Sequence, residues 1–156
     1  MATTATTRST TAASPVVAAL DQALADMYVL MSLTHSAHWN VEGPSFFSLH
    51  KAFHEQYEAI FENIDEVAER IRSLDAYPVG GLKHYATEAG IDEPKTVLSA
   101  KDYVAGLVVA HEKTITDLTT MRDRAGDAND LQTQDLAIKL LEWHQKTVWM
   151  LKSYLK

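Results

Sequence analysis

Apolar residues recur every three or four positions along four long stretches of the chain, which places them on one face of an α-helix in each stretch. The first stretch follows Ser14-Pro15, an N-cap and a first-turn proline, and ends at about Val41. The Gly43-Pro44 break separates it from the second stretch, which covers about 45–74 and has Ser45 in position to cap its start. The pattern predicts two long helices joined by a short turn.

Two prolines and three glycines interrupt residues 75–95, too many for a long helix, although the segment LKHYATEA is predicted to form a short one. A third long helix is predicted at about 99–124, with a weak capping box at Ser99 and its end marked by Gly126. The fourth covers about 130–155. Four long helices with short turns inside each pair and one long connection describe an all-α four-helix bundle with a single crossover.

The chain has 156 residues, of which 46% are hydrophobic and 22% charged, as in one ordinary globular domain. Residues 1–14 are almost entirely Thr, Ala and Ser and are predicted to be a disordered tail, so the bundle is assigned to 15–156. No run of eighteen apolar residues and no signal sequence is present, which favours a cytoplasmic protein without a membrane partner. Because the chain has no cysteine, any metal must be held by nitrogen and oxygen ligands.

Histidines and carboxylates share one stripe of the predicted helix 45–74. His50 and His54 are four residues apart, as are Asp65 and Glu69, so each pair could hold one metal ion. At 100° per residue all four side chains fall within a sector of about 100°. Fifteen residues of helix separate His50 from Asp65 by roughly 22 Å, however, and metal–ligand bonds are only about 2 Å long. The two pairs therefore cannot form one site within a single chain.

A second copy of the same helix, antiparallel across a two-fold axis, would bring the pairs together, since residue i then faces residue j wherever i + j is constant. The residue numbers of His50 and Glu69 add up to 119, as do those of His54 and Asp65. An axis near residue 59 therefore predicts two equal sites per dimer, each with histidines from one chain and carboxylates from the other.

His38 precedes the short turn and is expected to fold back towards His50, which completes a histidine-rich half-site. Imidazole and carboxylate ligands with open positions suit ferrous iron, and zinc or manganese could also occupy such a site. The chain has no Glu-x-x-His motif, so the di-iron centre that other bundles build inside one chain is absent. Taken singly, each of these residues would be an ordinary solvated or ion-paired side chain. Their shared stripe of the helix and the common residue-number sum of 119 distinguish them from such side chains.

Trp39, beside His38, is most simply a packing residue, and its alternative role is an electron donor or radical sink next to an oxidising centre. His35 and His111 are expected to pack at helix faces. Four histidines show no comparable companions and are left out of the predicted site: His35, His84, His111 and His144.

The segment 34–74, THSAHWNVEGPSFFSLHKAFHEQYEAIFENIDEVAERIRSL, resembles the Dps family of mini-ferritins. The order His-Trp-Asn, Gly, Phe-x-x-x-His and Asp-x-x-x-Glu-Arg is specific, and the helix layout extends the resemblance over 15–156. The resemblance implies a ferritin-like bundle that assembles as a dodecamer, oxidises iron at two-fold interfaces, usually with hydrogen peroxide rather than oxygen, and stores a ferric mineral. It also implies a ligand set divided between two subunits: His38, His50 and the residue at 54 from one, Asp65 and Glu69 from the other.

The chain departs from the family at His54, because members commonly carry Asp there. A histidine makes the second metal position richer in nitrogen and less negative, which could favour zinc. Acidic residues near the last turn between helices resemble the family's lining of three-fold entry pores, although an acid at a helix start is also favourable for dipole reasons alone. These pore candidates are Asp127, Asp130 and Asp135.

The net charge of −7 argues against a nucleic-acid partner, and the tail offers only Arg8 as a basic side chain. Twelve such chains would carry a charge of −84 (12 × −7), so direct DNA binding and a nucleoid-coating role are not expected. The sequence thus predicts a ferroxidase and iron-storage protein that protects against oxidative damage. The main alternative is a protein that scavenges or stores iron or zinc with little turnover; an unrelated signalling bundle would require the stripe to be accidental.

Overall fold

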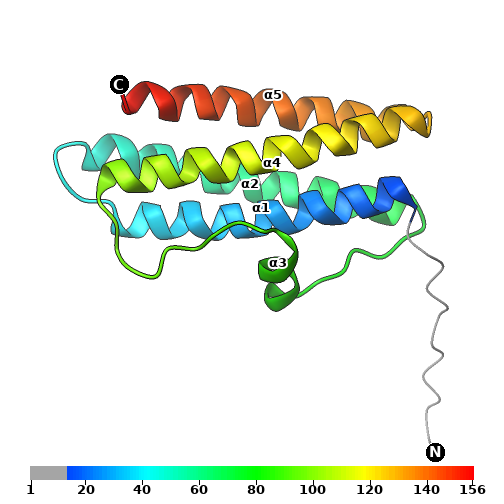
Figure 1. The fold of residues 1–156 in the computed structure, drawn as a ribbon, viewed down its shortest axis with the longest axis horizontal. Helices are drawn as coiled ribbons and strands as arrows, with labels where there is room; N and C mark the ends of the chain where they lie inside the picture. The colour runs from blue at the N-terminus through cyan, green and yellow to red at the C-terminus, as the bar shows by residue number, and fades with distance from the viewer. Residues whose placement is uncertain (1–13) are drawn as a thin grey trace, which may run out of the picture.

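The computed structural model describes residues 14–156, which form five helices and no strand (Figure 1). This confirms the predicted all-α bundle with one long crossover that carries a short helix. Residues 1–13 of the predicted tail lie outside the described residues, and Ser14 is the N-cap of the first helix. The helices are α1 (Pro15–Asn40), α2 (Phe46–Ser73), α3 (Leu82–Glu88), α4 (Ala100–Asp127) and α5 (Leu131–Tyr154).

The four long helices are arranged as two antiparallel hairpins (Figure 1). α1 packs against α2 in one hairpin and α4 against α5 in the other, while α1 also packs against α4 and so joins the two. α3 lies in the crossover and contacts α1. The short turn between α1 and α2 therefore places the C-terminal end of α1 beside the N-terminal end of α2, at one end of the bundle.

The core is built from apolar side chains of all five helices, and α1 contributes the most continuous part of it. α1 is also the one helix of the described chain that is long and apolar enough to cross a membrane by length and composition. Of its most apolar window, 61% is buried within the bundle. Its apolar character is therefore explained by its central position against α2, α3 and α4.

The predicted helix starts are correct at Ser14 and Ser99, whose hydroxyls each accept a hydrogen bond from the backbone N–H three residues later, at 3.2 Å. Ser45 is the N-cap residue of α2, as predicted, but its side chain makes no capping hydrogen bond. The backbone of Ser45 is near-helical, with φ −94° and ψ 11°, rather than extended. The extended form is what turns a capping hydroxyl towards the free N–H groups of the first turn.

The predicted end of the third long helix at Gly126 was also wrong, because α4 continues through this glycine. Asn129, with φ 54°, supplies the left-handed residue that ends the helix, and the N–H of Asp130 donates to the carbonyl oxygen of Ala125 at 2.9 Å. A Cβ atom at Gly126 would lie 2.5 Å from Nε2 of Gln134. The glycine therefore leaves room for the Gln134 side chain of α5 rather than terminating α4.

Candidate metal centre

His38, in the last turn of α1, faces His50, near the start of α2. Their rings stack with centroids 3.8 Å apart, and Nδ1 of each ring donates to the backbone carbonyl oxygen of the other residue at 2.8 Å. A carbonyl oxygen only accepts hydrogen bonds, so both Nδ1 atoms carry hydrogen, and in the neutral rings both Nε2 atoms present a lone pair. This is the tautomer that a metal ligand bound through Nε2 requires.

His54 lies one helical turn after His50 and joins the same group, with its ring centroid 5.4 Å from that of His38. Its Nδ1 is 2.6 Å from the hydroxyl of Tyr57, and its Nε2 is 3.2 Å from a carboxylate oxygen of Glu58. The structure thus gathers three half-buried imidazoles from two helices, as the sequence predicted for one half of a site.

Asp65 and Glu69 are exposed on α2 and make no ion pair or hydrogen bond with the described part of the chain. Because α2 is unbroken, the separation of roughly 22 Å between His50 and Asp65 along the helix remains. Among residues 14–156, no three His, Asp or Glu side chains converge on one metal position. A single chain therefore carries two partial ligand sets, and the complete five-ligand set stays a prediction.

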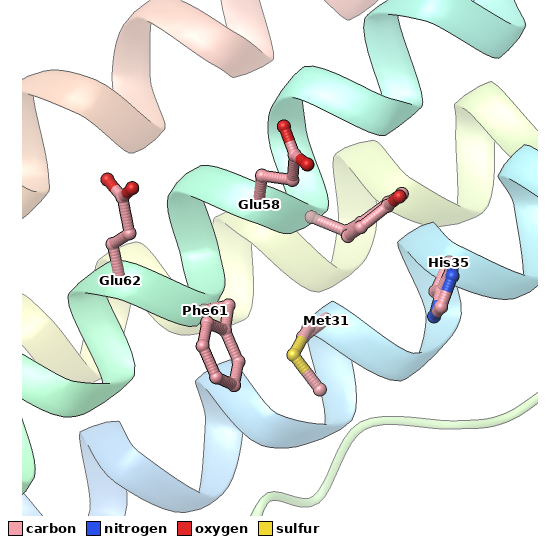
Figure 2. A pocket seen from close by; sticks show the side chains of 6 residues that line it. Met31, His35, Glu58, Phe61 and Glu62 are labelled. Carbon is pink, nitrogen blue, oxygen red and sulfur yellow. The ribbon is translucent and has the colours of Figure 1, made fainter.

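A groove of about 550 Å³ lies between α1 and α2, with His35 at its edge (Figure 2). Met31 and His35 line it from α1, and the acidic side chains of Glu58 and Glu62 lie along its α2 side with Phe61 (Figure 2). The groove thus extends from the histidine group along α2 towards the two distant carboxylates. Besides His35 and Tyr57, it is lined by apolar and acidic side chains, and neither Lys nor Arg lines it.

Tyr57 was not predicted as a site residue and His35 was set aside, yet both lie beside the histidine group of His38, His50 and His54. The ring of Tyr57 lies 4.2 Å from that of His35 and 5.4 Å from that of His38. The available signal was spacing, since Tyr57 follows His54 by three positions and His50 by seven, on the same stripe of α2. His35 could not be placed by spacing alone, because its partner comes from another helix.

Trp39 is 65% exposed, so its interpretation as a packing residue was wrong for the single chain. Its ring contacts that of His35, with centroids 4.0 Å apart, and otherwise faces outward. Phe61, on the neighbouring groove, is similarly 61% exposed. Two large aromatic side chains thus stand exposed beside the histidine group.

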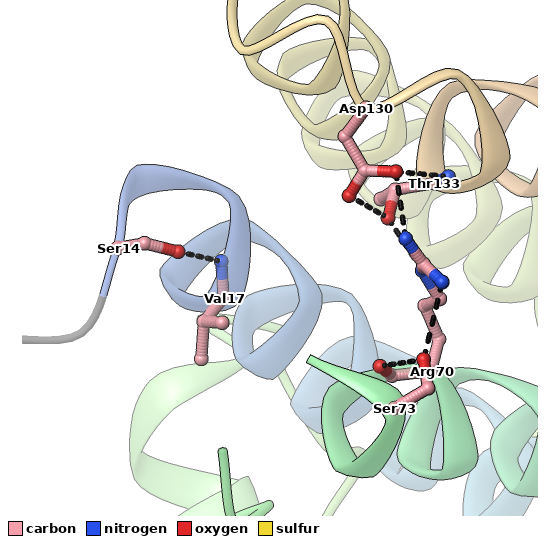
Figure 3. Close-up of polar contacts among 6 residues, drawn as sticks. All are labelled: Ser14, Val17, Arg70, Ser73, Asp130 and Thr133. Atoms are coloured by element: carbon pink, nitrogen blue, oxygen red, sulfur yellow. Dashed lines mark hydrogen bonds and ion pairs between the residues drawn. The ribbon is translucent and has the colours of Figure 1, made fainter. Parts of the chain in front are cut away.

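Of the three pore candidates, Asp130 is engaged inside the chain (Figure 3). Its carboxylate caps α5 by accepting from the backbone N–H of Thr133 at 3.0 Å and pairs with Arg70 at 2.7 Å. Burial alone would raise its pKa, but the hydrogen bonds from Thr133 and the charge of Arg70 together lower the pKa of Asp130. The helix-start role therefore accounts for Asp130, whereas Asp127 and Asp135 are exposed and remain pore candidates.

His111 and His144 are fully buried and pair with each other in the bundle core, a contact that was not predicted from the sequence. His111 was expected to pack at a helix face, and its side chain packs on the buried face of α4. The two lie on α4 and α5, and their meeting depends on how those helices are rotated, which spacing within one helix does not determine.

A second buried group missed by the sequence is Asp26, whose side chain is inaccessible to solvent. Burial and the neighbouring carboxylate of Asp117 raise the pKa of Asp26 to about 8, against the opposing charge of Lys113, 3.6 Å away. Gln22 donates to the Asp26 carboxyl at 3.0 Å. This group lies between α1 and α4, on helices other than the one that carries the carboxylates of the predicted metal site.

The family model for the ferritin-like domain matches residues 17–156. The protein is therefore a member of the ferritin-like class, as its four-helix bundle indicates. It is 42% identical over 143 residues to a low-temperature-induced protein of Nostoc sp. described as uncharacterised, covering 90% of this chain and 80% of the relative. It is 35% identical over 141 residues to the DNA protection during starvation protein of Brevibacillus brevis, and the match covers 90% of this chain and 95% of that relative.

A solved structure of the Dps protein from Vibrio cholerae superposes with a TM-score of 0.86 at 33% identity, covering 90% of this chain and 89% of that chain. That protein is described as a member of a broad superfamily of ferritin-like diiron-carboxylate proteins. Within the ferritin-like class, the chain belongs to the Dps family.

Proposed function

We propose that this protein oxidises ferrous iron, with hydrogen peroxide as the preferred oxidant, at sites shared between two copies of the chain, and stores the ferric product inside a hollow dodecamer in the cytoplasm. One observation carries the proposal. Three imidazoles gather at the α1–α2 turn, two of them with Nε2 lone pairs fixed for metal binding, while two unpaired carboxylates lie roughly 22 Å along the same stripe.

The surface around this half-site supports the sharing. An antiparallel second copy of α2 would set Asp65 and Glu69 opposite His54 and His50, and the same contact would cover the exposed rings of Trp39 and Phe61. Exposed aromatic side chains next to a groove are typical of protein interfaces. Covering them would also reduce access of water to the metal site, which strengthens the electrostatic interactions there.

The proposed chemistry balances with two iron ions per peroxide. Each ferrous ion gives up one electron, hydrogen peroxide accepts both as its O–O bond breaks, and two protons complete two water molecules. Because peroxide receives two electrons together, no hydroxyl radical is released. The imidazoles and carboxylates would position the two ions and stabilise the charge that develops on them. Trp39, exposed and in contact with His35, would supply the second electron where peroxide reacts at a site that holds only one ferrous ion.

The alternative is a protein that scavenges or stores zinc or iron with little turnover, and His54 is the observation that favours it. Three imidazoles make the histidine half-site softer and less negative than one with an aspartate, which suits zinc. In either case we propose no direct DNA binding, since the chain has a net charge of −7. Protection of DNA would then follow from the removal of iron and peroxide.

A complementation experiment tests the shared site. One variant carries His38→Ala and His50→Ala, and the other carries Asp65→Ala and Glu69→Ala. Each alone should oxidise iron with peroxide at least about 10-fold more slowly than the wild type, since mutation of metal-binding groups costs that much or more. Co-assembly after dissociation should restore part of the activity, because each mixed dimer has one intact site and one site without either ligand set. The rate is followed by ferric absorbance under anaerobic addition of peroxide.

Glu55→Ala, an exposed carboxylate on the same helix, is the matched control and should leave the rate unchanged. Co-assembled variants that stay inactive would refute a site shared between chains. A wild-type protein that binds iron at the site without peroxide consumption would instead establish the scavenging alternative.

A further inference from the structure

His54 differs from the other two histidines in what holds its ring. His38 and His50 donate Nδ1–H to backbone carbonyl oxygens, whereas Nδ1 of His54 meets the hydroxyl of Tyr57 at 2.6 Å. Its Nε2 meets the carboxylate of Glu58 at 3.2 Å. Both partners follow His54 on α2, by three and four residues. The third imidazole is therefore held by side chains alone, and its tautomer is not fixed by the backbone.

The two partners of His54 impose different conditions on its hydrogens. A carboxylate only accepts hydrogen bonds, so the contact with Glu58 requires a hydrogen on Nε2, whereas a hydroxyl can donate or accept and can pair with Nδ1 in either tautomer. A metal bound at Nε2 needs the lone pair there, which leaves the hydrogen of the neutral ring on Nδ1. When the metal binds, Nε2 therefore releases one proton to solvent and Nδ1 takes one up. The number of protons on the imidazole ring does not change.

We propose that Tyr57 is a positioning residue that accepts the Nδ1–H of His54 and so presents Nε2 to the second metal ion. Tyr57 thereby replaces, for His54, the backbone carbonyl oxygens that orient His38 and His50. This role rests on the shared metal site proposed above. An oriented Nε2 of His54 would suit the second metal position to zinc and other cations that prefer nitrogen ligands. Two neighbouring rings hold the ring of Tyr57 in place for this role. Its centroid lies 4.2 Å from that of His35 and 5.4 Å from that of His38.

Tyr57→Phe tests this role, because it keeps the ring and removes the hydroxyl. Zinc alone is titrated calorimetrically into the assembled full-length protein, and two ions are expected to bind each shared site. Loss of the hydroxyl should lower the affinity for the second zinc ion about 10- to 100-fold, which is the usual effect of losing the partner of a ligating histidine. The affinity for the first zinc ion should change by less than about two-fold. Tyr28→Phe is the matched control, since the Tyr28 ring stacks on Tyr85 with centroids 4.2 Å apart. This change should leave the affinity for both zinc ions unaltered.

A second background separates tautomer control from a merely structural role of the hydroxyl. Aspartate has no ring tautomer, so in a His54→Asp protein the Tyr57→Phe change should alter the affinity for the second ion by less than about two-fold. An equal loss in both backgrounds, or no loss in the wild-type background, would overturn the role of Tyr57 while leaving the shared site intact. Zinc binding that survives Asp65→Ala and Glu69→Ala would overturn the shared site itself and this inference with it.

Discussion

The Nδ1 atoms of His111 on α4 and His144 on α5 lie 2.8 Å apart in the bundle core, and neither side chain is accessible to solvent. One Nδ1 must donate and the other accept, so the pair is compatible with two neutral rings but not with two charged ones. Neither Nε2 atom has a hydrogen-bond partner among residues 14–156. Burial lowers the pKa of His144 to about 3, and burial, with a smaller electrostatic contribution from His144, lowers the pKa of His111.

The pair makes stability depend on pH in a defined direction. The unfolded histidines take up protons near pH 6.5, while the folded pair stays neutral, so the unfolded state binds more protons below that pH. Stability is therefore complete above pH 6.5 and falls as the pH drops towards 3. At pH 5 the loss from His144 alone is about 2 kcal/mol. We expect the thermal midpoint of the wild type to fall steeply between pH 6.5 and 4.

His111→Gln and His144→Gln should each flatten this dependence, and the double variant should flatten it most. Thr147→Ser changes a buried neighbour on α5 that does not titrate, so it should shift the midpoint without changing the slope against pH. Differential scanning calorimetry from pH 7 to pH 4 measures both quantities. Slopes that match the wild type in the histidine variants would show that the pair is not the source of the dependence.

Asp26 gives the opposite pH dependence. Its folded pKa of about 8 exceeds the usual value of 3.8, so between these values the folded state holds a proton that the unfolded state releases. Its contribution to stability is complete below pH 3.8 and is lost as the pH rises to 8. Asp26→Asn removes the ionisation, and an amide can still pair with Gln22. The variant should therefore gain stability relative to the wild type as the pH rises.

The measurement is the difference in thermal midpoint between Asp26→Asn and the wild type at pH 5 and at pH 8. We expect the difference to move in favour of the variant at the higher pH. Asp92→Asn, exposed in the crossover, is the control and should show no such change. A difference that is the same at both pH values would mean that Asp26 is ionised throughout in the folded protein.

The helix layout could be predicted from sequence because each long helix shows its own periodic apolar face and each break contains glycine, proline or a capping residue. The roles of two residues differed from the prediction, one because of a neighbouring helix and one because of its own backbone conformation. Gly126 was expected to end a helix, but it continues α4 and permits the approach of Gln134 on α5. Ser45 has the composition of a cap but not the extended backbone that a cap requires.

The site could be predicted only as far as one helix determines it. His50 and His54 share a stripe of α2, and the short turn returns His38 to them, so their grouping follows from periodicity. The contact of Tyr57 with His35 and the pairing of His111 with His144 join different helices, whose rotation depends on the packing of the whole core. Sequence spacing contains no direct information about that rotation.

Arg70 joins the end of α2 to the start of α5 and should contribute to the stability of the chain. It donates to the Asp130 carboxylate at 2.7 Å and to the Thr133 hydroxyl at 2.8 Å, and both members of the ion pair are largely buried (Figure 3). Arg70→Ala should cost about 2–3 kcal/mol, because the partly buried carboxylate loses its charged donor. Arg122→Ala, which breaks an exposed ion pair with Asp123, should cost less than about 1 kcal/mol. Urea denaturation compares the two variants, and equal losses would contradict the prediction.

Phe61 tests whether the groove between α1 and α2 is the surface that a second copy covers. The side chain is 61% exposed and lies between the acidic residues Glu58 and Glu62. Phe61→Glu would remove the apolar contact and bring a further negative charge into an interface that already contains acids from both copies. Because the side chain lies outside the core, the monomer should keep its helical circular dichroism while its native mass decreases.

Iron oxidation should fall together with assembly in Phe61→Glu, although all five predicted ligands are intact, because the carboxylates of one chain no longer reach the histidines of the other. Val97→Glu introduces the same charge at an equally exposed apolar position in the crossover and is the matched control for solubility and net charge. Light scattering and peroxide-dependent ferric absorbance on the same samples test the link. A variant that became monomeric yet kept the wild-type rate would show that each chain holds a complete site, which the separation of roughly 22 Å along α2 argues against.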